Sequence, residues 1–280
     1  MDRELEDSVG LAIELVREAL AHDGGLVVLT GAGISAQSGV PTFRGPEGHW
    51  TIGSRNYQPQ DLATAAAFKR LPREIWGWYL YRRSICRAAV PNPGHRALAE
   101  LERALPDRLR LVTQNVDGLH LRAGNTLANT LQIHGNIDFA RCTAGCSATP
   151  FLVPSEFDGF GRDDRLDDDA YARLACARCG AAARPHVLWF DEYYDEPLFR
   201  AESAIACARD AALLVVIGTA GATSLPMQLA GVVARSGRPI LDINTDDNPF
   251  AEIAARSGGL ALRGSAATVL PALYEALSGS

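Results

Sequence analysis

A short polar segment and a single histidine have the side-chain types that catalysis needs. The segment "TQNVDGLH" carries Gln114, Asn115 and Asp117 within four positions, and "IHGN" adds His134. Polar residues at the end of a parallel strand face the ligand crevice, and histidine titrates near neutral pH, as a general base must. An isolated histidine is more often structural. The catalytic interpretation of His134 therefore depends on its lying beside the polar segment.

Four cysteines form two pairs with the spacing of metal ligands. Three residues separate Cys142 from Cys146, and two residues separate Cys176 from Cys179, with 29 residues between the pairs. Four thiolates bind zinc tetrahedrally and leave no open position, which makes a structural site. The second pair alone would also fit a redox motif, but two pairs in a segment with few apolar residues favour zinc. The other two cysteines have apolar, helix-like surroundings and are interpreted as core thiols: Cys86 and Cys207.

A glycine-rich segment, "GAGISAQSG" (31–39), follows a strand-like apolar run. Gly31 and Gly33 permit a tight turn and a close approach of the backbone to a pyrophosphate at a helix N-terminus. A tight turn without a ligand is the alternative, because this pattern alone is weak. A dinucleotide oxidoreductase would have a second strand ending in Asp or Glu about 20 residues further on, whereas "PTFRGPEGHWTIG" indicates a loop. The segment therefore predicts nucleotide binding without the usual hydride-transfer arrangement.

The segment "WYLYRR" places Tyr79 three residues before Arg82. On a helix, these two side chains would share one face. Either the helix is an ordinary amphipathic one, or the pair faces a pocket and binds a charged group. We interpret the interleaved Tyr81 and Arg83 as packing and solvent residues.

Buried strands that alternate with helices are expected to position these residues. Such a pattern favours a parallel sheet with helices on both faces, and hence an α/β fold. The predicted strands lie within residues 25–33, 108–115, 212–219, 238–244 and 259–264, and the predicted helices within residues 9–20, 225–236, 249–256 and 266–277.

Two segments interrupt the alternation of strands and helices, and we interpret them as insertions that form a smaller domain. Residues 46–90 combine loop and helix, and residues 140–182 hold the four paired cysteines and an acidic stretch, "DDRLDDD", which is expected to be a solvated loop. The larger domain would then be discontinuous and would comprise residues 1–45, 91–139 and 183–280.

Composition excludes several classes of function. The chain of 280 residues has a net charge of −6 and a pI of about 5.5, which gives no reason to expect nucleic acid as a partner. The longest apolar runs are too short to span a bilayer, and the acidic N-terminus has no apolar signal-peptide region. We therefore expect a cytoplasmic protein. The sequence does not give its oligomeric state, although we expect a monomer.

Taken together, the motifs resemble those of the sirtuins, NAD-dependent protein lysine deacylases. The resemblance covers about residues 25–275 and rests on motifs in the family's order: "GAGISAQSGVPTFRG", "TQNVDGLH", "IHGN", the cysteine pairs, "RPHVLWFDE", "GTA" and "IN". It implies a Rossmann-type large domain with an inserted small domain made of a zinc module and a helical module, and substrates that meet in the cleft between them.

The resemblance also implies a role for individual residues. NAD would be surrounded by Gly31, Ala32, Gly33, Ser35, Thr42, Phe43, Arg44, Gly218, Thr219, Ser224, Asn244, Ser265 and Ala266. Gln114, Asn115 and Asp117 would hold the nicotinamide and its ribose. An edge strand would pair with the acyl-lysine peptide, comprising Val187, Leu188, Trp189 and Phe190.

The implied reaction transfers an acyl group and moves no hydride. Nicotinamide leaves as the acyl carbonyl oxygen attacks the ribose. His134 then takes a proton from a ribose hydroxyl, which attacks the acyl carbon. The products are free lysine, nicotinamide and O-acyl-ADP-ribose.

The sharper likeness is to class III sirtuins, which remove succinyl, malonyl and glutaryl groups. In that class a Tyr-x-x-Arg pair binds the acyl carboxylate, and Tyr79 and Arg82 match it. Charge-assisted hydrogen bonds from a guanidinium suit this role. We therefore expect acidic acyl groups to be preferred and acetyl to be accepted.

Four features depart from the family's pattern. Pro59 stands where the vertebrate enzyme of the class has a small alanine, so it is expected to narrow the acyl pocket. Asp191 replaces a glycine beside the peptide channel and is expected to repel acidic substrates or to contact a basic peptide. The loop 218–226 is longer than usual, and the first cysteine pair is spaced more widely.

Three other functions fit the same residues. One is a deacetylase without a preference for acidic acyl groups. The chain would be an NAD-consuming ADP-ribosyltransferase or NAD glycohydrolase if ADP-ribose passed to protein or water. It would be a binding module without catalysis if NAD bound and no nicotinamide left. The joint presence of Gln114, Asn115, Asp117 and His134 argues against the binding module.

Overall fold

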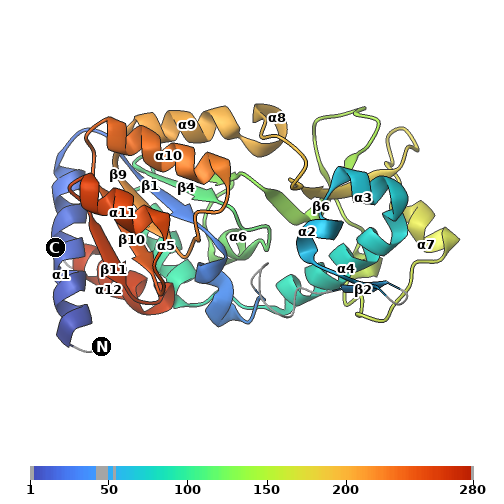
Figure 1. Ribbon diagram of the computed structural model, residues 1–280, viewed down its shortest axis with the longest axis horizontal. Coiled ribbons are helices and arrows are strands. Elements are labelled where there is room, and N and C mark those ends of the chain that lie inside the picture. Colours follow the sequence, from blue (N-terminus) through green and yellow to red (C-terminus); the bar gives the residue numbers. More distant parts are fainter. Residues whose placement is uncertain (1–2, 42–49, 53–54, 279–280) are drawn as a thin grey trace.

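A six-stranded parallel sheet forms the centre of the larger part of the molecule (Figure 1). The structure, a computed structural model, describes residues 3–41, 50–52 and 55–278. The strand order is β11-β10-β9-β1-β4-β5. The strands are β1 (Gly25–Thr30), β4 (Leu109–Thr113), β5 (Thr130–Gln132), β9 (Ala211–Ile217), β10 (Ile240–Asn244) and β11 (Leu260–Arg263).

The direction of strand order reverses between β1 and β9. The chain proceeds from β1 through β4 to β5 on one side, and from β9 through β10 to β11 on the other. In open α/β sheets, ligands bind outside the carboxyl ends of the strands at such a reversal. The fold therefore directs attention to the loops that follow β1 and β9.

Helices cover both faces of this sheet, as the sequence predicted. One face packs against α1 (Arg3–Ala21), α5 (Pro93–Ala104) and α12 (Ala266–Ser278), and the other against α9 (Ala201–Arg209), α10 (Ser224–Arg235) and α11 (Pro249–Arg256). Within β1, Val28 belongs to the first layer whereas Val27 and Leu29 belong to the second, because successive strand residues point to opposite faces.

The smaller part of the molecule combines a three-stranded antiparallel sheet with short helices (Figure 1). Its strands are β6 (Gly135–Cys142), β7 (Phe151–Leu152) and β8 (Ala183–Val187), and its helices are α2 (Pro59–Leu62), α3 (Ala65–Arg70), α4 (Pro72–Ala88) and α7 (Asp168–Arg173). Three almost completely buried indoles anchor its apolar core: Trp76, Trp78 and Trp189.

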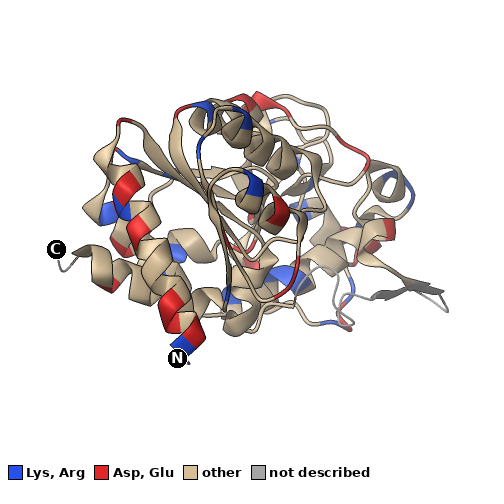
Figure 2. Ribbon diagram, turned by 60° about the vertical axis from the view of Figure 1, so that its left-hand side comes forward, with Lys and Arg blue, Asp and Glu red and all other residues tan. Residues whose placement is uncertain are grey.

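Short elements complete the chain. They are the 3-10 helices η1 (Ala32–Ser38) and η3 (Ser155–Phe157), the hairpin of β2 (Trp50–Ile52) and β3 (Arg55–Tyr57), and the helices α6 (Leu119–Ala123) and α8 (Glu196–Phe199). Basic and acidic residues are interspersed along the helices (Figure 2). In the described part of the chain, no helix has both the length and the apolar character that a membrane span requires.

Candidate functional site

The carboxyl ends of the parallel strands bring most of the predicted site residues to one edge of the sheet. Gly31 follows β1, Gln114 follows β4 and Gly218 follows β9, while Asn244 is the last residue of β10. His134 comes two residues after β5, a strand of three residues that the sequence analysis did not predict. Residues far apart in the sequence therefore share one edge because their strands run in the same direction.

Glycines allow the loop after β1 to lie directly on the loop after β9. The Gly33 N–H donates to the Gly218 carbonyl at 2.8 Å. A Cβ atom on Gly33 would lie 2.7 Å from the Cα of Gly218, and one on Gly31 would lie 2.6 Å from the Cβ of Thr219. Gly218 itself has a φ of +59°, which favours glycine. The glycine-rich segment thus has a packing role in addition to the predicted ligand role.

Amide side chains connect these loops to each other. Nε2 of Gln114 donates to the Thr219 hydroxyl at 2.9 Å, and Nδ2 of Asn115 donates to the Gly31 carbonyl at 3.0 Å. Nδ2 of Asn244 donates to the Thr219 carbonyl at 3.0 Å. The predicted nucleotide-binding residues therefore form one connected layer across β4, β1, β9 and β10.

A buried hydroxyl and a buried carboxylate lie beneath this layer. The Ser35 hydroxyl donates to Oδ2 of Asp117 at 2.7 Å and accepts a hydrogen bond from Asn115 at 3.2 Å. Burial raises the pKa of Asp117, although hydrogen bonds from the Leu119 N–H and from Ser35 oppose the shift. His95 lies 3.4 Å from the Ser35 hydroxyl and extends the polar cluster into α5.

The imidazole of His134 contacts a residue that the sequence analysis missed. Its Nε2 lies 2.8 Å from the hydroxyl of Tyr194. Burial lowers the pKa of His134 to about 4, opposed by a hydrogen bond to the Gln114 backbone. At neutral pH the imidazole is therefore uncharged and can accept a proton. Tyr194 lies in the segment "DEYYDEP". The only sign of a role in the sequence is that this segment follows shortly after β8.

The Tyr194 hydroxyl connects His134 to the loop after β9. Thr223 lies beside the Tyr194 hydroxyl, where it acts to lower the pKa of Tyr194, and the Thr223 hydroxyl donates to Oε1 of Gln114 at 2.9 Å. Thr223 is the residue before α10, whereas the predicted Ser224 is exposed at the first position of that helix. Thr223, rather than Ser224, is thus the residue of this loop that reaches the polar layer.

The remaining predicted cofactor residues lie around this edge. Ala32 begins η1 and is half-buried, Ser265 bonds to Thr268 at 2.8 Å, and Ala266 is buried at the start of α12. Three more predicted residues fall outside the described part of the chain: Thr42, Phe43 and Arg44.

Tyr79 and Arg82 both lie on α4. Tyr79 belongs to the core of the smaller part, whereas Arg82 is half-buried. The indole Nε1 of Trp189 donates to the Tyr79 hydroxyl at 2.8 Å, and Tyr79 is almost completely buried. Burial raises the pKa of Tyr79, and the charge of Arg82 opposes the shift. The guanidinium of the half-buried Arg82 lies over the Trp78 ring, 5.6 Å from its centroid. The phenol accepts one hydrogen bond and keeps its own proton to donate.

The prediction for Arg83 as a solvent residue is wrong. Its side chain is 2% exposed and forms ion pairs with Asp138 at 3.0 Å and Asp158 at 2.6 Å. Arg87 pairs with the same two carboxylates, each at 3.2 Å. A guanidinium can be buried when carboxylates compensate its charge, and short-range spacing on a helix does not reveal partners 55 and 75 residues away.

The predicted edge strand at residues 187–190 is interrupted after Val187, the last residue of β8. The next three backbone N–H groups donate within the chain: Leu188 to the His134 carbonyl, Trp189 to the Glu192 carboxylate, and Phe190 to the Ala63 carbonyl. A peptide strand cannot use these donors while they are so engaged. The side chain of Phe190 is 55% exposed.

Asp191 is engaged with the start of α3. Its carboxylate accepts hydrogen bonds from the N–H groups of Ala65 at 2.7 Å and Ala66 at 3.1 Å. Burial acts to raise the pKa of Asp191, but these hydrogen bonds outweigh it and lower the pKa. The local structure also accounts for the proline at position 59. Pro59 is buried at the first position of α2, where proline is favoured.

The four predicted metal ligands converge in the smaller part. The sulfur atoms of Cys142, Cys146, Cys176 and Cys179 all lie within 4.8 Å of one another. This separation fits a single tetrahedral zinc ion, whose bonds to sulfur are about 2.3 Å long. The cysteines come from the end of β6 and from the turn before β8, so one ion would hold these two segments together.

A model of the Sir2 family matches residues 31–224 of this chain. The chain belongs to the Sir2 family. The NAD-dependent protein deacylase of Leptospira interrogans serogroup Icterohaemorrhagiae serovar Lai (strain 56601) is 40% identical over 247 residues, which cover 88% of this chain and 90% of the relative.

Solved structures of Sir2 homologues resemble the chain over nearly its whole length. One is a Sir2 homologue in complex with NAD, with 35% identity and a TM-score of 0.78, covering 95% of this chain and 94% of the homologue. Another is a mutant homologue bound to 2′-O-acetyl ADP ribose, with 34% identity and a TM-score of 0.76, covering 100% and 97%.

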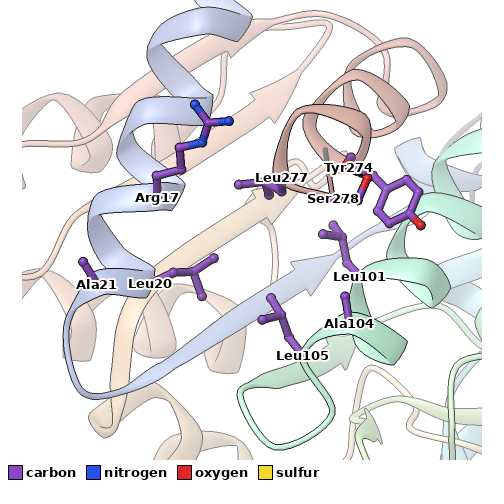
Figure 3. A pocket seen from close by; sticks show the side chains of 9 residues that line it. All are labelled: Arg17, Leu20, Ala21, Leu101, Ala104, Leu105, Tyr274, Leu277 and Ser278. Atoms are coloured by element: carbon purple, nitrogen blue, oxygen red, sulfur yellow. Dashed lines mark hydrogen bonds between the residues drawn. The ribbon is translucent and has the colours of Figure 1, made fainter. Parts of the chain in front are cut away.

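One pocket of this Sir2-family chain lies away from the polar layer. It has a volume of about 500 Å³ and lies between α1, α5 and α12 (Figure 3). Leu20 and Ala21 precede β1, and Leu105 precedes β4, so this pocket is at the amino-terminal edge of the sheet. Its walls are mainly hydrocarbon, and Arg17 at its rim donates to the Ala276 carbonyl at 2.7 Å. We therefore assign the chemistry to the carboxyl edge.

Proposed function

We propose that this protein is an NAD-dependent deacylase that removes acyl groups from lysine side chains of proteins, with a preference for acidic acyl groups. The observation that carries the proposal is the position of His134 beside Gln114, in a chain 40% identical to a protein deacylase. NAD would supply the ADP-ribose group that accepts the acyl group, and nicotinamide would be released.

The residues at the carboxyl edge have distinct roles in this proposal. Gln114, Asn115 and Asp117 orient the nicotinamide and its ribose, because Gln114 and Asn115 belong to the polar layer that joins the strand ends and Asp117 lies beneath it, bonded to Ser35. His134, neutral at pH 7, takes the proton of the ribose hydroxyl. The close packing of the Gly33 loop on the Gly218 loop exposes backbone groups to a pyrophosphate.

The segment from Leu188 to Phe190 connects the proposed base to the proposed acyl-binding residues. The Leu188 N–H bonds to the His134 carbonyl, and the next residue, Trp189, bonds to Tyr79 through its indole. An acyl-lysine that lies along this segment would place its carbonyl near His134 and its distal carboxylate near Tyr79 and Arg82. This arrangement supports a preference for succinyl and malonyl groups, with acetyl still accepted.

The zinc ion has a structural role in the proposal. Its four cysteine ligands leave no position for a substrate. We further propose that residues 1–45, 91–139 and 183–280 form the NAD-binding domain, with the helical module at 46–90 and the zinc module at 140–182.

A panel of acylated peptides tests the proposal. We expect succinyl- and malonyl-lysine peptides, incubated with NAD, to yield O-acyl-ADP-ribose faster than an acetyl-lysine peptide, as measured by mass spectrometry. Arg82→Met should lower desuccinylation about 10- to 100-fold, the worth of a charge-assisted hydrogen bond, and leave deacetylation nearly unchanged. No acyl transfer from any peptide would refute deacylation.

The same panel separates the alternatives. Loss of NAD without an acyl peptide would favour an NAD glycohydrolase or ADP-ribosyltransferase. Equal loss of both activities in Arg82→Met would show that Arg82 stabilises the fold and does not bind the acyl group.

A further inference from the structure

The Tyr194 hydroxyl lies against the ring nitrogen through which His134 would accept a proton. The Tyr194 hydroxyl lies 2.8 Å from Nε2, and the two ring centroids are 5.8 Å apart. A hydrogen bond with the Gln114 backbone raises the pKa of His134, so a ring nitrogen donates to that carbonyl. Because Nε2 faces Tyr194, the donor is Nδ1. In neutral His134 the lone pair is therefore on Nε2 and receives the phenol proton.

The Tyr194 hydroxyl has a second hydroxyl beside it. Thr223 acts to lower the pKa of Tyr194 and donates its own proton to Gln114 at 2.9 Å, so its oxygen can accept a proton from the phenol. Its ring packs against the apolar layer that covers one face of the large sheet. Burial raises the pKa of Tyr194 to about 12, which keeps the phenol protonated at neutral pH. The hydroxyl thus has a proton to give and a second hydroxyl beside it.

We propose that Tyr194 is a catalytic residue that relays the proton from the NAD ribose to His134, and that the Thr223 oxygen is the acceptor toward which the new phenol proton turns. This inference rests on the proposed deacylase function and assigns Tyr194 a step in it. A ribose hydroxyl that reached Nε2 directly would need the position that the phenol oxygen occupies. A ribose hydroxyl that reaches the phenol oxygen needs no such displacement.

The relay conserves atoms and electrons. The ribose O–H bond breaks and its proton moves to the Tyr194 oxygen, while the Tyr194 O–H bond breaks and its proton moves to Nε2 of His134. The phenol is restored and the imidazole becomes an imidazolium that donates to the phenol oxygen. The ribose oxygen keeps the electron pair with which it attacks the acyl carbon. The new phenol proton can then turn toward Thr223.

The test separates nicotinamide release, which precedes the base step, from formation of O-acyl-ADP-ribose, which follows it. In single turnovers with NAD and a succinyl-lysine peptide, we expect Tyr194→Phe to slow O-acyl-ADP-ribose formation about 100-fold or more, with nicotinamide release nearly unchanged. Thr223→Val should slow the same step by up to about 10-fold, the worth of one neutral hydrogen bond. Tyr193→Phe is the matched control, because the neighbouring Tyr193 is 91% exposed.

A solvent isotope measurement gives a readout that a purely structural role would not change. In mixtures of H₂O and D₂O, two protons in motion produce a curved dependence of the rate in the wild type, whereas Tyr194→Phe should give a linear one. Product formation by Tyr194→Phe at the wild-type rate would overturn the relay, and so would equal slowing of nicotinamide release. A wild-type protein that forms no O-acyl-ADP-ribose would instead refute the proposed function. If Tyr194→Phe did not fold, the mixtures of H₂O and D₂O would decide on the wild type alone, because a linear dependence of the rate of O-acyl-ADP-ribose formation would overturn the relay.

Discussion

Two neighbouring arginines on α4 show how one position along a helix separates two roles. Arg82 is half-buried beside Trp78, whereas Arg83 is buried between two carboxylates. One step along a helix turns the side chain by about 100°, so adjacent residues face different surroundings. We therefore expect substitutions of these two residues to change different measured quantities.

Arg83→Met should lower stability without changing acyl selectivity. Removal of one partner from a buried ion pair costs about 3–5 kcal/mol, and we expect the lower end because Arg87 remains beside both carboxylates. Urea denaturation measures the free energy of unfolding, and the ratio of desuccinylation to deacetylation measures selectivity. Arg82→Met is the matched control, with the opposite expectation. A selective loss of desuccinylation in Arg83→Met would contradict this division.

The sequence reveals the residues that belong to motifs, but it does not reveal the residues that complete their hydrogen bonds. Gln114, Asn115 and His134 could be predicted because polar residues at strand ends mark a crevice. Tyr194 and Thr223 could not, because their importance arises only where two loops meet. Short-range patterns carry no information about such contacts.

At the level of elements, Asp191 joins the segment after β8 to the start of α3. Its carboxylate accepts two of the backbone N–H groups that the first turn of a helix leaves unpaired. The sequence analysis expected this charge to act on the substrate. The structure shows that it is used within the chain, where it caps α3 together with Thr64.

Asp191→Ala should destabilise the protein by about 1 kcal/mol, as loss of a helix cap does. Because the pKa of Asp191 is lowered in the folded state, this contribution is present at neutral pH and is lost as pH falls through the folded-state pKa. Urea denaturation at pH 7 measures it, and Thr64→Ala, which removes the neighbouring cap, is the comparison. We expect the ratio of desuccinylation to deacetylation to stay constant. A selective gain in desuccinylation would show that the carboxylate repels acidic substrates after all.

The elements of the large sheet were predictable to a greater degree than those of the smaller part. The strands from β1 to β11 that the sequence predicted are continuous apolar runs, because both faces of the sheet are covered. The missed β5 has only three residues, and α1 begins at Arg3, ahead of the first apolar residue of its pattern. In the smaller part, cysteine spacing predicted the metal cluster, whereas the short strands β6 to β8 have no comparable pattern.

At the scale of the whole molecule, the proposed acyl-binding residues and the proposed base belong to different parts of the fold. Tyr79 packs in the core of the smaller part, and His134 lies at the carboxyl edge of the large sheet. Two consecutive residues connect them, because the Leu188 N–H bonds to the His134 carbonyl and the Trp189 indole bonds to the Tyr79 hydroxyl. In the proposed reaction, selectivity and catalysis would depend on how firmly this segment holds the two parts together.

Four histidines with lowered pKa values make the stability of the whole molecule depend on pH. Burial lowers the pKa of His95, His134 and His186 to about 4 each, and lowers that of His120 well below its usual value. Positive charges add to the shift at two of them: Arg122 and Arg96 at His95, and Arg141 and Arg184 at His186. In the unfolded chain, histidine has a pKa of about 6.5. Below that pH, the unfolded chain binds protons that the folded chain does not.

We therefore expect the free energy of unfolding to be greatest above pH 6.5 and to fall as pH decreases toward 4. Each such histidine contributes up to about 1.4 kcal/mol per pH unit within that window. His186→Gln isolates one of them, because its Nδ1 has no hydrogen-bond partner within the described structure and it stacks on Phe199. The stability advantage of the wild type over this variant should shrink by about 1.4 kcal/mol for each pH unit below 6.5. Loss of zinc in acid would affect both proteins equally, since the cysteines are unchanged, and cancels in the difference. Urea denaturation at pH 7.5, 6.5, 5.5 and 4.5 measures that difference, and a difference that stays constant would show that His186 titrates alike in the folded and unfolded chains.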